Sequence, residues 1–183
     1  MKVSIIGGGV IGLCSAYFLQ KEGYEVTIIE RGDISDGCSF GNMGFISPSH
    51  FIPFANPGII SQGLKWMLSS TSPFYIKPRL NLDLIQWGYH FWKSATHKKV
   101  NQNSQPLHEI LQLSRRLIET LRDDVGNVFE MQEKGCLMMC KKQKTLDHEF
   151  VIADAGEMFG LKVERLDRAG VQALEPNVEV NVA

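Results

Sequence analysis

The first thirty residues alternate between short apolar runs and glycine. Residues 2–6 and 24–30 are rich in Val and Ile and are typical of buried parallel strands. Between them, residues 11–22 are apolar at helical spacing and end at Gly23, which suits the left-handed position after a helix. The pattern predicts a strand, a glycine turn, a helix and a second strand parallel to the first.

After residue 30 the spacing of apolar residues changes. Residues 31–54 are rich in Gly, Ser, Asn and Pro, and we expect an ordered loop there with one short strand at most. Residues 128–132 and 136–141 are separated by three residues, which suits a hairpin, and residues 178–182 alternate like another strand. An antiparallel sheet is therefore expected to begin near residue 128. Helices are predicted over residues 58–69, 82–95, 107–125, 146–159 and 167–174.

Composition and charge then narrow the class of protein. Of the 183 residues, 44% are hydrophobic and 21% are charged, with 19 basic against 20 acidic side chains and a net charge of -1. These values are typical of a soluble globular protein. No basic stripe alternates with aromatic residues, so we expect no nucleic-acid partner.

Three further absences bear on location and chemistry. The longest uncharged stretch, residues 37–64, is interrupted by prolines and cannot form one membrane-spanning helix. The start has no basic n-region and no cleavage site, which favours a cytoplasmic or cytoplasm-facing protein. The four cysteines form no CxxC pair, so we expect neither a disulfide framework nor a metal site.

The turn after the first strand carries the candidate chemistry. Residues 7–12, Gly-Gly-Gly-Val-Ile-Gly, satisfy the GxGxxG pattern between a predicted strand and a predicted helix. Gly7 permits the tight turn, Gly9 lets a pyrophosphate approach the backbone, and Gly12 allows close contact of helix and strand. The helix N-terminus then offers N–H groups and a positive dipole end to the phosphates.

An acidic residue completes this unit. Glu30 follows Gly12 by 18 residues, at the end of the second strand, where a carboxylate accepts the hydroxyls of an adenosine ribose and repels a 2′-phosphate. A GxGxxG turn alone is weak evidence, because many glycine turns bind nothing. The positions that seat the helix on the sheet agree with it, and together they predict dinucleotide binding: Ala16, Leu19, Gly23 and Val26.

The segment after Glu30 distinguishes an FAD-binding domain from an NAD-binding one. A nicotinamide domain would continue with another helix and parallel strand, whereas this chain continues with a long uncharged loop. The stretches VSIIGGGVIG (residues 3–12), Ile29-Glu30-Arg31 and SFGNMGFISP (residues 39–48) resemble the D-amino acid dehydrogenase branch of the D-amino acid oxidase superfamily of FAD enzymes. Residues 55–58 and 64–67, Ala-Asn-Pro-Gly and Leu-Lys-Trp-Met, are also similar to that branch.

The resemblance implies an α/β fold that is incomplete relative to this family. A Rossmann-like FAD-binding βαβ unit would be followed by helices and by the start of an antiparallel substrate-domain sheet. Residues 1–54 would be the N-terminal part of the FAD-binding domain, 55–125 a helical segment, and 126–183 the start of the substrate domain. The chain would then be a truncated product, or it would be completed by a partner chain.

The resemblance also implies roles for matched residues. Glu30 would bind the ribose and Arg31 would lie beside the adenine. The diphosphate would be bound by Gly7, Gly9, Val10, Ile11 and Gly12. The ribityl chain and isoalloxazine would be lined by Ser39, Asn42, Met43 and Gly44. An ordinary Asx-turn region is the alternative for this last segment.

The implied reaction is oxidation of a D-amino acid or related small amine to an imino or keto acid, with electrons passing through FAD to a quinone or to oxygen. The family holds its substrate with residues of its C-terminal half, so we assign no catalytic residue here. An oxygen-using amino acid oxidase and a non-catalytic flavin-binding subunit stay open as alternatives.

Other conspicuous residues have two interpretations each. His50 could face a substrate, but a loop hydrogen bond is the commoner role for such a residue. The aromatic region around Trp66, Trp87 and Trp92 is typical of a core, with peripheral contact to a membrane or a quinone as the alternative. Four arginines are expected to be solvated or ion-paired: Arg79, Arg115, Arg116 and Arg122.

Overall fold

The computed structural model describes residues 1–67, 76, 79 and 81–182 of the chain. These residues belong to two compact units, Met1–Ile46 and Ser47–Ala183. The first unit contains both strands of the described residues, and the second contains helices α2 to α6. The division into residues 1–54, 55–125 and 126–183 stays a prediction.

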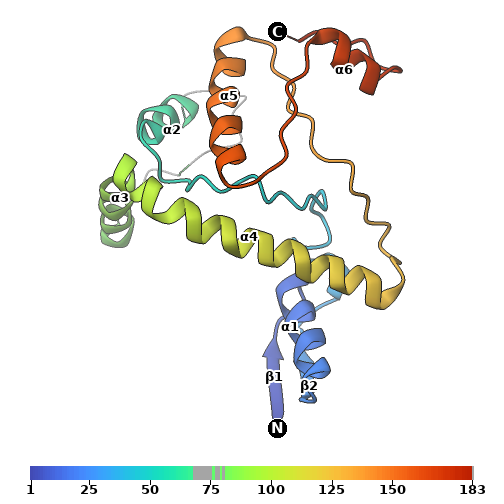
Figure 1. Cartoon of the computed structure of the whole chain (residues 1–183). Helices are drawn as coiled ribbons and strands as arrows, with labels where there is room; N and C mark the ends of the chain where they lie inside the picture. The colour runs from blue at the N-terminus through green and yellow to red at the C-terminus, as the bar shows by residue number, and fades with distance from the viewer. Residues whose placement is uncertain (68–75, 77–78, 80, 183) are drawn as a thin grey trace. The chain divides into compact units, whose positions relative to one another are not determined.

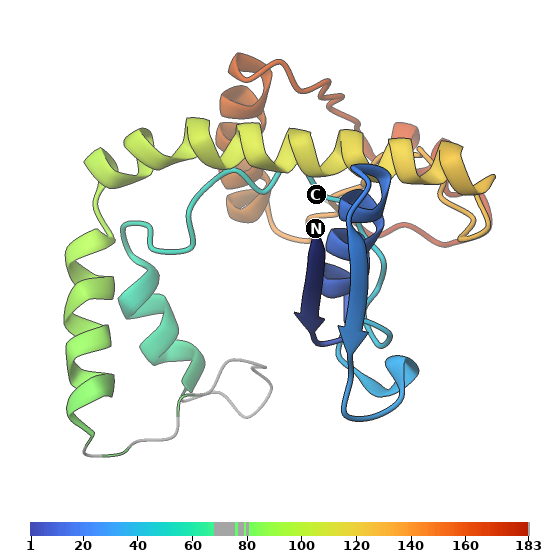
Figure 2. The ribbon, with the colours of Figure 1, turned by 90° about the horizontal axis from the view of Figure 1, so that it is seen from below.

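The first unit is the predicted strand–helix–strand unit. Strand β1 (Lys2–Ile6) pairs in parallel with β2 (Glu25–Ile29), from Lys2 opposite Glu25 to Ile6 opposite Ile29. Helix α1 (Val10–Lys21) connects the strands and packs on both of them (Figure 2). Alternate strand residues are half-buried because one face of the sheet meets α1. The following loop contains one 3-10 turn, η1 (Ile34–Asp36).

The second unit is helical, with α2 (Ile59–Met67), α3 (Leu82–Ser94), α4 (His97–Val125), α5 (Gln143–Met158) and α6 (Arg168–Leu174) (Figure 1). An aromatic cluster connects the loop before α2 with helix α4 and with the C-terminal end of α5. The Phe51 ring lies edge-on to Phe159 at 4.8 Å, and His108 stacks on Phe159 at 5.1 Å. Phe51 is only 2% exposed, so this cluster is a true core. Residues 68 and 69 of the predicted second helix lie outside the described residues.

Helix α4 begins ten residues earlier than the sequence predicts. The prediction placed its start at Leu107, directly after Pro106, whereas the helix begins at His97 and contains Pro106. The Thr96 side chain caps it by accepting a hydrogen bond from the Lys99 N–H at 3.3 Å. The first turns are polar and carry no apolar stripe, and this is why their sequence gave no helical signal.

The expected antiparallel hairpin is wrong for the described structure. Residues 128–132 and 136–141 contain no strand in that structure. The Asn127 side chain explains part of this difference, because its Oδ1 accepts from the Met131 N–H at 2.7 Å and its Nδ2 donates to the Met131 carbonyl at 3.3 Å. The backbone groups of Met131 are therefore bound by a side chain instead of a neighbouring strand. Two isolated strands are also marginal without further partners.

The expected strand at residues 178–182 is also absent from the described structure, and here too a side chain binds the backbone. Gln172 on α6 donates its Nε2 to the Val178 carbonyl at 2.8 Å and accepts from the Val180 N–H at 3.2 Å. The Val180 side chain is buried although its backbone is not in a sheet. The described part of the chain is thus a parallel βαβ unit followed by helices, without an antiparallel sheet.

None of the helices among the described residues has the length and apolar character that crossing a bilayer requires.

Candidate dinucleotide site

The turn between β1 and α1 is shaped by glycines at Gly7 and Gly12. Gly7 has a φ of +104°, a value that residues with a Cβ rarely adopt, and its N–H donates to the Ile29 carbonyl at 2.8 Å. A Cβ on Gly12 would lie 2.0 Å from the Gly7 carbonyl oxygen. The turn therefore folds directly over the first turn of α1, and both positions require glycine.

The N-terminus of α1 presents N–H groups above this turn. The N-cap residue is Gly9, which has no side chain to accept them. The Val10 N–H donates to the Ser39 hydroxyl at 3.1 Å, and a Cβ on Gly9 would lie 3.1 Å from the same oxygen. Among the described residues, neither the Ile11 nor the Gly12 N–H group donates a hydrogen bond. Because its N–H groups are unbonded and the helix dipole is positive at this end, the N-terminus of α1 is a favourable binding site for an anion.

Glu30 lies at the end of β2, beside the turn. Its Oε2 accepts from the Gly8 N–H at 2.6 Å, and its Oε1 accepts from the N–H groups of Arg31 at 2.8 Å and Gly32 at 3.2 Å. The hydrogen bond from Gly8, followed by those from Arg31 and Gly32, holds the pKa of the Glu30 carboxyl below its ordinary value. Glu30 is therefore an anion at neutral pH.

The loop after Glu30 is held by an Asx turn next to Ser39. Asn42 donates its Nδ2 to the Ser39 carbonyl at 2.5 Å, and its Oδ1 accepts from the Gly44 N–H at 2.6 Å. Met43 is 81% exposed, and Arg31 is exposed as well. Gly7, Gly9, Val10, Glu30 and Ser39 are thus brought together, whereas the Arg31 and Met43 side chains extend into solvent.

Two glycines of this site were missed by the sequence analysis. Gly8 and Gly32 both donate to Glu30, although neither belongs to the GxGxxG signature. A Cβ on Gly8 would lie 3.1 Å from Ile34 Cγ1 and 3.4 Å from Glu30 Oε2. The available signal was Gly8 itself, the middle glycine of the run at residues 7–9, which the motif does not require.

His50 and the four arginines lie outside this site's unit. His50 is exposed and belongs to the second unit, and its N–H donates to the Ser47 carbonyl at 3.3 Å.

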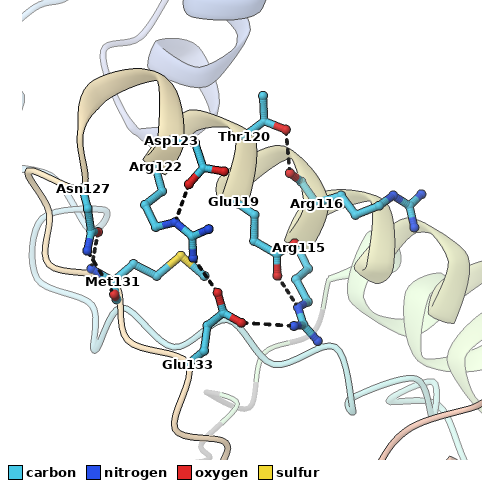
Figure 3. A network of polar contacts seen from close by, with 9 residues as sticks. All are labelled: Arg115, Arg116, Glu119, Thr120, Arg122, Asp123, Asn127, Met131 and Glu133. Carbon is cyan, nitrogen blue, oxygen red and sulfur yellow. Dashed lines mark hydrogen bonds and ion pairs between the residues drawn. The ribbon is translucent and has the colours of Figure 1, made fainter.

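Arg115 and Arg122 are ion-paired as predicted, because both contact Glu133 (Figure 3). Arg115 also pairs with Glu119, and Arg122 also pairs with Asp123. Hydrogen bonds to Asp123 and then Glu133 raise the pKa of Arg122. This network fastens the segment after α4 to that helix.

Acidification provides a test of the Glu30 geometry. A carboxyl whose pKa is lowered on folding stabilises the fold above its unfolded value, here 4.5, and this contribution is lost as the pH falls through the folded value. We expect the Gly8 amide resonance of the wild-type chain to titrate with a midpoint below pH 4.5 in NMR spectra. In Glu30→Gln this titration should disappear. A midpoint at or above 4.5 in the wild type would contradict the hydrogen-bonded arrangement.

Comparison with known proteins gives a consistent set of relatives. Residues 2–183 match the model of a family described as FAD dependent oxidoreductase. The chain is similar to the D-amino acid dehydrogenase of Granulibacter bethesdensis, with 34% identity over 181 residues that cover 98% of this chain and 43% of that protein. It is 33% identical to the D-amino acid dehydrogenase of Methylobacterium nodulans over 177 residues, 96% of this chain and 42% of the relative. D-amino acid dehydrogenase 1 of Mesorhizobium japonicum is 31% identical over 178 residues, with 96% and 42% coverage.

The chain spans less than half the length of these curated relatives. No solved structure matches it.

Proposed function

Because the chain belongs to the FAD-dependent oxidoreductase family, we propose that residues 1–46 bind the ADP half of FAD over the turn at residues 7–12. The observation that carries this proposal is the pair of unbonded N–H groups of Ile11 and Gly12 at the start of α1, in the part of the chain that the structure describes. Phosphate oxygens are suitable acceptors for these donors. Gly7, Gly9 and Val10 would contact the same diphosphate with their backbone.

Glu30 has room for one further donor without rearrangement. An ionised carboxylate has about four acceptor positions, and in this structure Oε1 accepts two hydrogen bonds and Oε2 accepts one. We assign the remaining position on Oε2 to one ribose hydroxyl. A second hydroxyl would replace the Gly32 N–H, whose 3.2 Å bond is the longest of the three. The negative charge disfavours a ribose that carries a 2′-phosphate.

The loop beyond Ser39 would meet the flavin half of the cofactor. We assign Ser39, Asn42, Met43 and Gly44 to the ribityl chain and isoalloxazine, and Arg31 to the adenine. The exposed Met43 side chain can cover an apolar ring, and the Asx turn at Asn42 holds the backbone around it. Bound FAD would supply a two-electron acceptor at its ring system.

For the whole protein we propose oxidation of a D-amino acid or related small amine. Loss of two electrons and two protons from the CH–NH2 group yields an imine, and water converts the imine into a keto acid and ammonia. The names of the relatives support this substrate class, and the electrons would pass on to a quinone or another acceptor. We assign no catalytic residue to this chain, whose role here is to bind and orient the cofactor.

Titration of the purified chain with FAD and with ADP tests the site directly. We expect saturable quenching of flavin fluorescence, and we expect ADP to compete because it fills the diphosphate and ribose positions. Circular dichroism of the same sample reports whether the chain is folded. A folded chain that does not bind FAD, or one from which ADP cannot displace FAD, would contradict the proposed site.

Two alternative functions would use the same FAD site, and further assays distinguish them from a dehydrogenase. An oxygen-using amino acid oxidase would produce peroxide from D-amino acids, whereas a dehydrogenase requires a dye or quinone. The other alternative is a non-catalytic flavin-binding subunit that a partner chain completes. Such a subunit would bind FAD but bleach no flavin absorbance with any member of a D-amino acid panel, either alone or with its partner chain.

A further inference from the structure

The loop that follows Ser39 is fixed at both of its ends, one in each unit of the chain. At the first end, the Ser39 hydroxyl accepts from the Val10 N–H at 3.1 Å. At the second end, the Phe51 side chain is buried in the second unit. We call the residues between these points, 40–50, the connecting loop. The residues that we assign to the flavin ring lie in its first half: Asn42, Met43 and Gly44.

Phe51 is held by contacts with α4 and α5. Its ring centroid lies 6.2 Å from that of His108 on α4 and 4.8 Å from that of Phe159, the residue that follows α5. A Cβ placed on Gly156 would lie 3.7 Å from Phe51 Cε1, so the ring also lies against the last turn of α5. His108 stacks on Phe159 at 5.1 Å and completes the cluster. We call Phe51, His108 and Phe159 the aromatic anchor.

His108 contributes the packing of its ring to this anchor. The residue is 8% exposed, and among the described residues its buried Nδ1 has no hydrogen-bond partner. Ser104, one turn earlier on α4 and buried as well, donates its hydroxyl to the Val100 carbonyl at 2.8 Å. An unpaired buried nitrogen costs free energy, so the ring contacts are what stabilises an aromatic residue at this position.

The connecting loop itself is apolar and uncovered between its fixed ends. Phe40, Met43 and Phe45 are all exposed. A segment with few buried contacts has low local stability, so a ligand that meets it must order it on binding. Fixing both ends of a loop reduces the conformational entropy that is lost when the loop closes on a ligand. The aromatic anchor is therefore placed to lower the free-energy cost of ordering this loop.

We propose that Phe51 and His108 are positioning residues for FAD, which act through the connecting loop on the flavin half of the cofactor. This inference rests on the proposed function, because it requires FAD over the turn at residues 7–12. ADP ends at its second phosphate and uses only the glycine turn and Glu30, so its binding does not depend on the anchor. FAD also reaches the connecting loop. By linkage, bound FAD then stabilises the anchor in return.

Phe51→Ala separates the two ligands. We expect it to weaken FAD binding on the order of tenfold, within the usual range of coupling between sites. The affinity for ADP should change by less than about twofold, as it does for independent sites. FAD that still binds should be less quenched at saturation, because the loop no longer holds the flavin ring in one position. The control is Val171→Ala, which truncates another buried side chain of the second unit and should leave the ratio of FAD to ADP affinity unchanged.

His108 allows a matched pair of variants. His108→Phe keeps an aromatic ring and should retain the wild-type ratio of FAD to ADP affinity, since the Nδ1 that it removes has no partner in the described part of the chain. His108→Ala leaves a cavity beside Phe51 and Phe159 and should lower the ratio as Phe51→Ala does. Circular dichroism of each variant reports whether the helices persist.

Hydrogen exchange of the wild-type chain tests the reverse direction and needs no variant. Saturating FAD should slow amide exchange around His108 and Phe159, because the ordered loop holds Phe51 between them. Saturating ADP should leave the exchange of both segments unchanged. Protection by both ligands, or by neither, would contradict the coupling.

These measurements distinguish failure of the positioning role from failure of the proposed site. If neither ADP nor FAD binds the wild-type chain, the site itself is wrong. If both bind and Phe51→Ala leaves their affinity ratio at the wild-type value, the anchor does not act on the flavin half, whether or not the second unit stays folded. An equal fall of the ratio in Val171→Ala would reduce the anchor to general stability. Equal falls in His108→Phe and His108→Ala would overturn the role of packing.

Discussion

Gly12→Ala is expected to abolish FAD binding by unfolding the first unit. The new Cβ would lie 2.0 Å from the Gly7 carbonyl oxygen, and it would meet backbone there, which cannot rotate away as a side chain can. Overpacking of this kind typically costs about 3 kcal/mol. Small domains have little stability to lose, and this unit has only two paired strands and one long helix.

Gly37→Ala is the matched control for this substitution. A Cβ on Gly37 would meet no heavy atom within 4 Å, and its φ of -87° suits alanine. FAD titration and amide hydrogen exchange of β1 and α1 should be unchanged in Gly37→Ala and strongly affected in Gly12→Ala. If Gly12→Ala folds and binds FAD like the wild type, the close turn described here does not exist.

Glu30→Ala is expected to weaken FAD and ADP binding by about 10- to 100-fold, the range for losing hydrogen bonds to a charged group. The substitution removes the acceptor proposed for the ribose. It also leaves the N–H groups of Gly8, Arg31 and Gly32 without their carboxylate acceptor, so the turn is no longer hydrogen-bonded to the residue that follows β2. Glu30→Gln should be intermediate, because one amide oxygen still accepts while its NH2 group faces other donors.

A change of ligand separates the ribose contact from the support of the turn. Wild-type chain should prefer ADP to 2′-deoxy-ADP, and Glu30→Ala should bind both equally, since the discriminating acceptor is gone. Glu22→Ala, a carboxylate removed at the other end of α1, serves as the control and should keep the preference. Equal discrimination in the wild type and Glu30→Ala would place the ribose elsewhere.

The residues of the candidate site were predicted unequally well. The glycine turn and Glu30 follow from spacing along a single strand–helix–strand unit, and the structure places them together. The role of Ser39 at the ribityl chain stays a prediction, and the hydrogen bond that its hydroxyl accepts at the N-terminus of α1 was not predicted. That contact joins residues 29 positions apart, and no local pattern encodes it. The backbone donors Arg31 and Gly32 could not be recognised for a different reason: they are adjacent to Glu30, but every non-proline residue carries an N–H group, so the residue type does not reveal which of them donates.

From the sequence alone came the βαβ unit, the requirement for glycine in its turn and the positions of most helices. Each of these depends on interactions within a few residues, namely backbone sterics and the periodicity of apolar side chains. The tertiary structure alone decided whether residues 128–141 and 178–182 form strands, because a strand needs partners for its N–H and C=O groups. The side chains of Asn127 and Gln172 bind part of that backbone, so neither segment pairs with a neighbouring strand in the described structure.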